Sequence, residues 1–258
     1  MTFTILFLVN TIAGYLIGSV CSAIIVCQLF DLPDPRQKGS KNPGATNVLR
    51  LAGKHYASIV LVADMLKGLL PLLLAHALDA GPTIMGFTCL AAVLGHMYPL
   101  FFNFKGGKGV ATALGALLGF HVVLGSMVIV TWLVVAYISK YSSLASLIAL
   151  LLAPFFALLH GGSPNAFLPL IVMSLLIVYK HRDNITRLVD GTESKISFRQ
   201  STSSTPPPGD NKSTPAKKKA PKAATTTMAK KPVKKEAKPA KKQSTKKSTP
   251  KQGPQDAE

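Results

Sequence analysis

The chain has 258 residues, of which 29 are Lys or Arg and 11 are Asp or Glu, and 48% are hydrophobic. Residues 1–191 carry 12 basic and 6 acidic side chains among long apolar runs, whereas residues 192–258 carry 17 and 5 and almost no large apolar residue. The three cysteines lie in apolar runs without CxxC spacing, which argues against a disulfide framework or a zinc site. We expect an all-α, polytopic membrane-embedded domain over residues 1–191 and a disordered Lys/Pro/Ala-rich tail over residues 192–258.

The apolar runs predict the membrane spans. No Lys or Arg precedes the first run, so we interpret it as a retained span rather than a signal peptide. The runs are Phe3 to Leu29, Tyr56 to Leu78, Thr83 to Phe102, Val110 to Ile138, Leu144 to Leu159 and Ala166 to Tyr179. Lys and Arg occur in the loop from Asp31 to His55, at Lys105 and Lys108, at Lys140 and after Tyr179, and are absent from the connections Asp79 to Pro82 and His160 to Asn165. The positive-inside rule therefore predicts an outer N-terminus and cytoplasmic basic loops.

The run from Val110 to Ile138 must cross the membrane an even number of times, which we call the parity argument. Basic residues flank it on both sides, at Lys108 and Lys140, so both of its ends are expected in the cytoplasm. A single crossing takes about 20 residues, and this run of 29 is long for one crossing and short for two. We predict two short helices that break near His121, which gives seven transmembrane helices and a cytoplasmic C-terminus.

Two charged residues, Asp64 and Lys67, lie within the second run, three positions apart on one helical face. Charged groups at such depth pair with each other or with a ligand. Both interpretations stay open at this point: a self-neutralising pair that holds helices together, or part of a binding site.

The segment Phe104-Lys105-Gly106-Gly107-Lys108-Gly109 combines glycine freedom with two cations, immediately before an apolar run. Three glycines let backbone N–H groups turn toward one point, and a helix that starts near Val110 adds its positive end, so the segment suits a phosphate. It does not have the spacing of a Walker loop. The alternative is an ordinary turn between two membrane helices with its lysines at the lipid surface.

The first basic loop, from Asp31 to His55, contains the polar segment Gly39 to Arg50 and is also called the first polar loop below. This segment is rich in hydroxyls, amides and cations and poor in carboxylates. Arg50 can grip a phosphate through two parallel hydrogen bonds. Candidate anion-binding residues in this loop are Ser40, Asn42, Thr46, Asn47 and Arg50. Ser, Asn, Pro and Gly are also ordinary turn formers, and topology alone would produce a basic loop.

Four polar clusters are placed on the same membrane face by the charge count. They are the first basic loop, Lys105 to Gly109, Lys140 to Ser143, and His181 to Arg187. Together they describe one cationic site that fits a substrate with a phosphate at one end and a hydrocarbon chain at the other.

The usual catalytic machinery is missing from the sequence. There is no G-x-S-x-G elbow, no histidine followed by Asp at the spacing H-x-x-x-x-D, and no carboxylate pair for metal-assisted transfer. We therefore expect neither a metal nor a cofactor, and a reaction that depends on positioning and charge stabilisation.

At this point the sequence resembles the PlsY-type acyl-phosphate:glycerol-3-phosphate acyltransferases of bacterial inner membranes. The similarity extends over essentially all of residues 1–190, and one departure is Lys41, where the family pattern often has Gly. The matching stretches are Gly39 to Arg50, Asp64-x-x-Lys67-Gly68, Gly95-His96-x-x-Pro99, Phe104 to Thr112, Lys140 to Ser146 and His181-Arg182-x-Asn184-Ile185.

The resemblance implies a seven-helix membrane enzyme of phospholipid biosynthesis with its active site on the cytoplasmic side. Such an enzyme moves a fatty acyl group from acyl phosphate to the 1-hydroxyl of glycerol 3-phosphate, and releases lysophosphatidic acid and phosphate. An acyl phosphate is a mixed anhydride with an activated carbonyl, so no covalent enzyme intermediate is required. This agrees with the missing nucleophile.

The resemblance also implies roles for individual residues. The catalytic residues are Lys108, Arg50 and His181, with Lys108 foremost in holding the acyl phosphate headgroup. The substrate-binding residues are Ser40, Asn42, Thr46, Asn47, Lys105, Gly106, Gly107, Gly109, Ser142 and Asn184. His181 is the one candidate general base by position, and we favour a phosphate oxygen of the substrate as the base instead.

Other functions compete with this interpretation. A transporter of a phosphorylated metabolite would also contain a cationic pocket, and a membrane anchor would serve to present the tail. The tail itself is expected to bind anionic lipid of the inner leaflet, at roughly 1 kcal/mol per Lys near the surface, or, as the alternative, nucleic acid.

Overall fold

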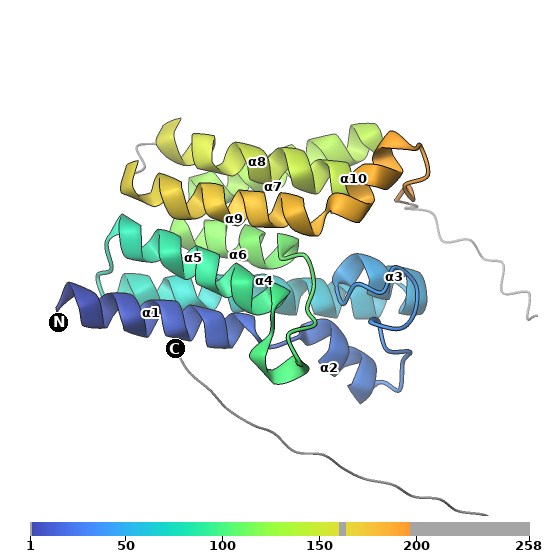
Figure 1. Cartoon of the computed structure of the whole chain (residues 1–258), viewed down its shortest axis with the longest axis horizontal. Helices are drawn as coiled ribbons and strands as arrows, with labels where there is room; N and C mark the ends of the chain where they lie inside the picture. Colours follow the sequence, from blue (N-terminus) through green and yellow to red (C-terminus); the bar gives the residue numbers. More distant parts are fainter. Residues whose placement is uncertain (1, 160–163, 197–258) are drawn as a thin grey trace, which may run out of the picture. The chain divides into compact units, whose positions relative to one another are not determined.

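A computed structural model describes residues 2–159 and 164–196, and within these ranges all regular structure is helical (Figure 1). The expectation of an all-α membrane bundle is confirmed. Residues 197–258, most of the expected tail, lie outside the described residues. In chain order the helices are α1 (Phe3–Gly18), α2 (Ser22–Leu29), α3 (Ala45–Ala52), α4 (Lys54–Ala77), α5 (Pro82–Met97), the 3-10 turn η1 (Leu100–Phe102), α6 (Val110–Phe120), α7 (Val122–Ser139), α8 (Ser142–Leu159), η2 (Pro164–Ala166), α9 (Phe167–Lys180) and α10 (Arg182–Val189).

The first apolar run, interpreted as a retained span, is divided into α1 and α2. The interruption spans Ser19 to Cys21. It frees the carbonyl of Val20, which accepts a hydrogen bond from Lys67 Nζ of α4 at 2.6 Å. A backbone carbonyl without a partner is costly in an apolar environment, and the lysine supplies that partner.

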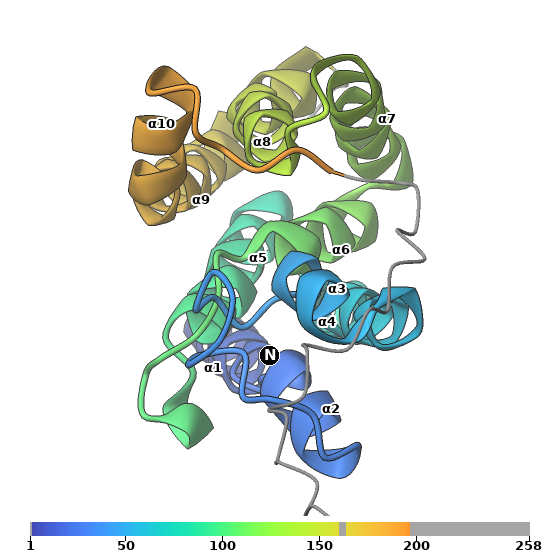
Figure 2. The same cartoon turned by 90° about the vertical axis from the view of Figure 1, so that its right-hand side faces the viewer.

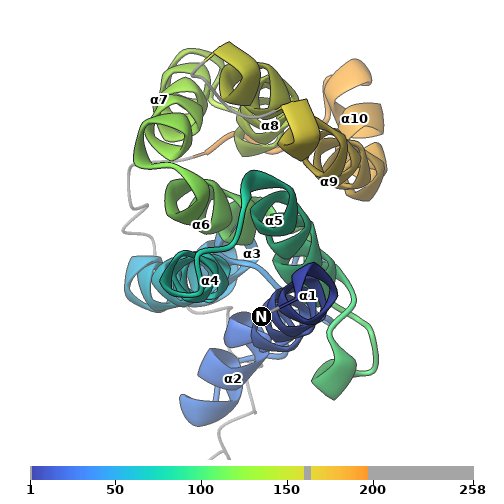
Figure 3. The same ribbon diagram turned by 90° about the vertical axis from the view of Figure 1, so that its left-hand side faces the viewer.

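The predicted break at His121 is confirmed. Helix α6 ends at Phe120 and α7 begins at Val122, while His121 itself is extended, with φ −159° and ψ 123°. The two helices pack side by side (Figure 3), and a Cβ on Gly125 would lie only 2.5 Å from the backbone of Leu118. The chain therefore reverses direction at His121, as the parity argument required.

Because of this reversal, successive long helices run in opposite directions, and the polar clusters gather at one end of the bundle. Viewed toward that end, the first polar loop with α3, the loop after η1, the start of α8 and helix α10 lie around a common region (Figure 2). The opposite end carries the short connections 78–81 and the turn at His121.

The apolar helices have the lengths that a membrane requires. Within the described residues, five stretches are long enough to cross: Phe3–Leu29, Lys54–Ala77, Pro82–Phe102, Val122–Ser139 and Ser142–Leu159. A sixth is the pair Pro164–Lys180 and Arg182–Val189, bent by 59°. The predicted count of seven is reached only with α6, whose 11 residues fall short of the usual length of about 20. Most of α6 is buried among its neighbours, so lipid does not set its length.

Small residues bring α4 and α6 into close contact. A Cβ on Gly68 would lie 2.0 Å from the carbonyl oxygen of Thr112, and one on Gly115 would lie 1.9 Å from that of Met65. No side chain fits at either position, which is how glycine allows two membrane helices to pack closely. This contact places Asp64 and the rest of that turn of α4 beside the beginning of α6.

Candidate anion-binding active site

The segment between α5 and α6 turns sharply through η1 and the glycine-rich loop. Phe104 and Gly109 have left-handed backbones, with φ of 56° and 83°. The N–H of Phe104 donates to the Pro99 carbonyl at 3.0 Å, and that of Gly107 donates to the His96 carbonyl at 3.1 Å. These N–H groups are satisfied inside the chain. The N–H of Gly107 therefore serves the fold and is taken from the predicted phosphate site, whereas phosphate binding by the backbone at Gly106 and Gly109 stays a prediction.

The central glycines are required because the loop is tightly packed. A Cβ on Gly106 would lie 2.0 Å from the His96 carbonyl oxygen, and one on Gly107 would lie 2.2 Å from His96 Nε2 and 2.9 Å from the Pro43 carbonyl oxygen. The loop is thus held between the end of α5 and the first polar loop. Two of the four clusters predicted from the sequence are in direct contact here.

Lys108 is the charged group on which the clusters converge. Its Nζ donates a hydrogen bond to Asn184 Oδ1 of α10. Burial is the main cause that lowers the pKa of Lys108 to about 8; Arg187 and Arg50 lower this pKa as well, while Glu193 opposes them. A cation that is partly desolvated beside other cations is stabilised by an arriving anion.

A carboxylate from beyond α10 ties this region together. Glu193 Oε1 accepts hydrogen bonds from Ser143 Oγ at 2.7 Å and from Asn184 Nδ2 at 2.6 Å, and Oε2 accepts one from Arg187 Nε at 2.7 Å. Although burial raises the pKa of Glu193, these three bonds outweigh it and hold that pKa below its ordinary value. The Glu193 carboxylate fixes the Asn184 amide with its oxygen toward Lys108.

His181 lies at the junction of α9 and α10 and is buried. Its Nδ1 is 2.8 Å from the Ile177 carbonyl oxygen, so Nδ1 carries the proton and donates. Burial is the main cause that lowers the pKa of His181 to about 4, and the charge of Lys108 contributes. The ring is therefore neutral at pH 7, and Nε2 is a hydrogen-bond acceptor.

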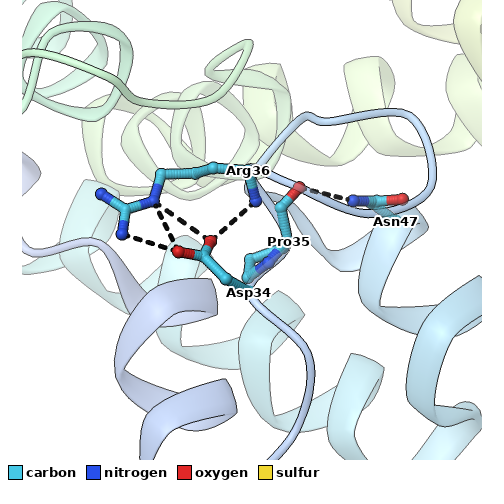
Figure 4. A network of polar contacts seen from close by, with 4 residues as sticks. All are labelled: Asp34, Pro35, Arg36 and Asn47. Atoms are coloured by element: carbon cyan, nitrogen blue, oxygen red, sulfur yellow. Dashed lines mark hydrogen bonds and ion pairs between the residues drawn. The ribbon is translucent and has the colours of Figure 1, made fainter. Parts of the chain in front are cut away.

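The first polar loop is shaped by Asn47, whose side chain is buried. Asn47 Nδ2 donates to the carbonyl oxygens of Pro35 at 2.9 Å and Lys38 at 3.1 Å, and Oδ1 accepts from the backbone N–H of Ser40 at 2.9 Å. Figure 4 shows Asn47 reaching the Pro35 carbonyl next to the ion pair of Asp34 and Arg36. The amide of Asn47 is thus used to hold the loop closed on α3.

The structure brings together four predicted residues from three segments: Lys108 bonds to Asn184, and the charges of Arg50 and Lys108 act on Lys108 and His181 respectively. The remaining predicted residues lie in the two loops, in the first turn of α3 and at the start of α8. Ser40, Thr46 and Lys105 are exposed, Asn42, Gly106 and Ser142 are half-buried, and Asn47, Gly107 and Gly109 are buried.

The sequence-based list omits three residues that complete this region: Ser143, Arg187 and Glu193. Glu193 falls in the expected tail, yet residues 192–196 contact the bundle, with the N–H of Ile196 donating to the Lys140 carbonyl at 2.7 Å. The division of the chain at residue 191 stays a prediction. The one sequence signal for Glu193 is an acid that stands four residues after the end of α10, ahead of the basic stretch of the tail.

An all-helical bundle with apolar outer faces and a cationic, donor-rich site at one end defines a membrane protein that acts on an amphipathic anion. A family model described as glycerol-3-phosphate acyltransferase matches residues 8–191. The chain belongs to this family.

Individual relatives agree with this assignment. The glycerol-3-phosphate acyltransferase of Legionella pneumophila (strain Corby) is 59% identical over 196 residues, which cover 76% of this chain and 71% of that protein. The enzyme of the same name from Vibrio campbellii is 51% identical over 189 residues, which cover 73% of this chain and 92% of that protein.

Two solved structures share the fold. Both are crystal structures of PlsY (YgiH), described as an integral membrane glycerol 3-phosphate acyltransferase. The glycerol 3-phosphate form has a TM-score of 0.71 at 41% identity and covers 74% of this chain and 96% of that chain. The lysophosphatidic acid form has a TM-score of 0.69 at 40% identity, with coverage of 74% and 95%.

Proposed function

We propose that this membrane-bound glycerol-3-phosphate acyltransferase takes its acyl group from acyl phosphate and transfers it to the 1-hydroxyl of glycerol 3-phosphate. Membership of the family carries the acyltransferase activity and argues against a transporter. The identity of the donor is our proposal. The observation that supports it most directly is Lys108, a half-buried cation beside Arg50 and Arg187 without a catalytic nucleophile in the cluster.

The proposed reaction needs no covalent enzyme intermediate. The 1-hydroxyl oxygen attacks the carbonyl carbon of the acyl phosphate, the bond from that carbon to the phosphate oxygen breaks, and its electron pair leaves with the phosphate. The hydroxyl proton is transferred to a phosphate oxygen. Lys108 and Arg50 hold the phosphate of the donor and balance the charge that grows as it leaves.

His181 orients the acceptor in this scheme. Its neutral ring offers Nε2 to the hydroxyl of glycerol 3-phosphate, because Nδ1 is already used on the Ile177 carbonyl. A base with a pKa of about 4 removes a proton weakly at pH 7, which supports a substrate phosphate oxygen as the base. Ser142 and Asn184 complete the acceptor site.

The two loops provide the rest of the phosphate site. Ser40 and Asn42 of the first loop and Thr46 of the first turn of α3 donate to phosphate oxygens, and Lys105 attracts the anion from the exposed edge. Asn47 keeps this loop in shape rather than binding substrate directly, because its side chain bonds to Pro35, Lys38 and Ser40 of the same loop.

Donor specificity tests the proposed function. Purified protein with glycerol 3-phosphate is expected to form lysophosphatidic acid from acyl phosphate and none from acyl-CoA, because the site is built for a leaving phosphate. Product is measured by mass spectrometry, and glycerol replaces glycerol 3-phosphate as the control acceptor. Equal rates with acyl-CoA and acyl phosphate would contradict the proposal that acyl phosphate is the specific donor.

We further propose that the polar end faces the cytoplasm of a bacterial inner membrane, with the N-terminus outside and the C-terminus inside. The support is the basic charge at that end and its scarcity in the described connection at the opposite end. The tail carries a net charge of +12 and would then lie beside the anionic inner leaflet, which we propose as its partner in preference to nucleic acid.

Two single-cysteine variants test this orientation. Lys38→Cys lies at the polar end, Gly81→Cys lies at the opposite end with open space for a side chain, and both positions are exposed. In intact bacterial cells a membrane-impermeant maleimide is expected to label Gly81→Cys, and to label Lys38→Cys only after permeabilisation. The three native cysteines are buried and provide the unlabelled control. The reverse pattern would invert the topology.

A further inference from the structure

A buried ionic network lies outside the site described above. Asp64 and Lys67 of α4 are 2.8 Å apart, and their side chains are 2% and 6% exposed. His96 of α5 is 5% exposed, with Nδ1 3.6 Å from Asp64 Oδ1 and 3.1 Å from Thr112 Oγ1 of α6. The network thus joins three helices at the depth where α4 and α6 are in closest contact.

The same histidine contacts the glycine-rich loop. Its carbonyl accepts the N–H of Gly107 at 3.1 Å, and its Nε2 lies 2.2 Å from the point that a Cβ on Gly107 would occupy. Thr112, the ring's other partner, stands in the first turn of α6, directly after the loop. His96 therefore fixes both the middle of the loop and the helix that follows, and Lys108 lies between these two points.

Burying charges costs free energy, and well-packed apolar residues hold helices together at least as well as a buried ion pair does. The pair Asp64 and Lys67 is thus poorly explained by stability alone. Its geometry has a directional consequence: the Thr112 hydroxyl is within hydrogen-bond distance of the imidazole Nδ1, and the Asp64 carboxylate faces the same nitrogen at 3.6 Å.

We propose that His96, oriented by Asp64, Lys67 and Thr112, is a positioning residue that sets the Gly107 backbone so that Lys108 Nζ is aimed at the phosphate site. This inference rests on the role proposed for Lys108. It assigns no contact between His96 and a substrate, and it extends the functional unit from the polar end into the apolar bundle.

The test uses two variants of the full-length enzyme. His96→Ala keeps the backbone bond to Gly107 but removes the ring that packs against it and the contact with Thr112, and kcat with acyl phosphate is expected to fall on the order of tenfold, since a small misplacement of a catalytic group is costly. Thr112→Val removes only the hydroxyl and keeps the volume, so it tests the network even where His96→Ala folds poorly. Thr112→Val is expected to lower kcat less than His96→Ala does.

The pH profile separates positioning from stability. The alkaline limb is the fall of kcat at high pH, and it lies near pH 8 when it reports the loss of the proton from Lys108. In both variants Lys108 becomes more hydrated, so this fall is expected at a higher pH. The charged and titratable groups that face Lys108 stay unchanged in both; they are Arg50 of α3, His181 between α9 and α10, Asp183 and Arg187 of α10, and Glu193.

His76→Ala is the matched control. His76 Nε2 lies 2.9 Å from the Gly119 carbonyl oxygen, so it also links α4 to α6, at the other end of the bundle. It is expected to lower the melting temperature and to leave the alkaline limb in place. Folded His96→Ala and Thr112→Val with wild-type kcat and an unmoved limb would overturn the inference. If Lys108→Arg retains the limb at pH 8, the assignment of that limb to Lys108 fails instead.

Discussion

Lys108→Met is expected to lower kcat for transfer from acyl phosphate by about 10³-fold, the upper range for loss of a single group that stabilises developing charge. Methionine keeps the length and apolar stem of the side chain but removes the charge and the donor to Asn184. The remaining basic groups, Arg50 and Arg187, still attract phosphate, so the KM is expected to change much less than kcat.

The activity of the wild-type enzyme is expected to fall as the pH rises above the pKa of Lys108. The pKa of Lys108 is lowered to about 8, so the protonated, active form prevails below that value and is lost as the pH rises through it. The wild-type rate is expected to fall about tenfold per pH unit well above pH 8. Arginine stays charged throughout, so Lys108→Arg is expected to keep part of the activity and to lose this alkaline limb.

Lys105→Met is the matched control, because Lys105 belongs to the same loop but is exposed. A loss of less than tenfold is expected from it, mainly in KM and at low salt. Near wild-type kcat in a folded Lys108→Met protein would contradict the proposed role of Lys108 in holding the leaving phosphate.

Glu193→Ala is expected to lower kcat by about 10²-fold and to lower the melting temperature. The change releases three donors at once, from Ser143, Asn184 and Arg187, and the Asn184 amide is then free to turn away from Lys108. A misplaced contact to a catalytic group has an effect of this size.

The stability effect of Glu193 has a predicted pH window. Its pKa is lowered in the folded protein, so its contribution to stability is present above the ordinary carboxyl value of 4.5 and is lost as the pH falls through the lower, folded value. The difference in melting temperature between wild type and Glu193→Gln is therefore expected to shrink as the pH is lowered in that range. Asp190→Ala, at an exposed acid close by, is the control and should change little.

An outcome in which Glu193→Ala retains wild-type kcat would separate residues 192–196 from the active site. That result would agree with a catalytic domain that ends at residue 191. Activity measured with glycerol 3-phosphate held at saturation distinguishes a change in kcat from weaker binding of the acceptor.

Much of the fold could be predicted because a membrane imposes simple constraints on a chain. The lengths of the apolar runs predicted the helices, and the positions of the basic loops predicted which ends share a membrane face. Two successive basic loops, at Lys108 and Lys140, required an even number of crossings between them and so predicted the break near His121. The interruption of the first run at Val20 could not be predicted in this way. It depends on a hydrogen bond from Lys67, a residue that is distant in the sequence.

The candidate site was predictable in part for a similar reason. Lys108, Arg50, His181 and Asn184 are polar residues at the ends of apolar runs, and topology places such ends on one face. Asn47 shows where that reasoning stops, since a polar side chain in a loop serves equally well to hold the loop together.

The amino-acid sequence by itself determined the class of this protein: a helical membrane enzyme with a cationic site at one end, because hydropathy and charge are local properties. Only the tertiary structure decided which donors and acceptors meet. It joined Glu193 to Asn184 and Arg187, and it placed His96 against Gly107. Such pairings depend on close approach between segments that are far apart in the chain, and no pattern along the sequence contains that distance.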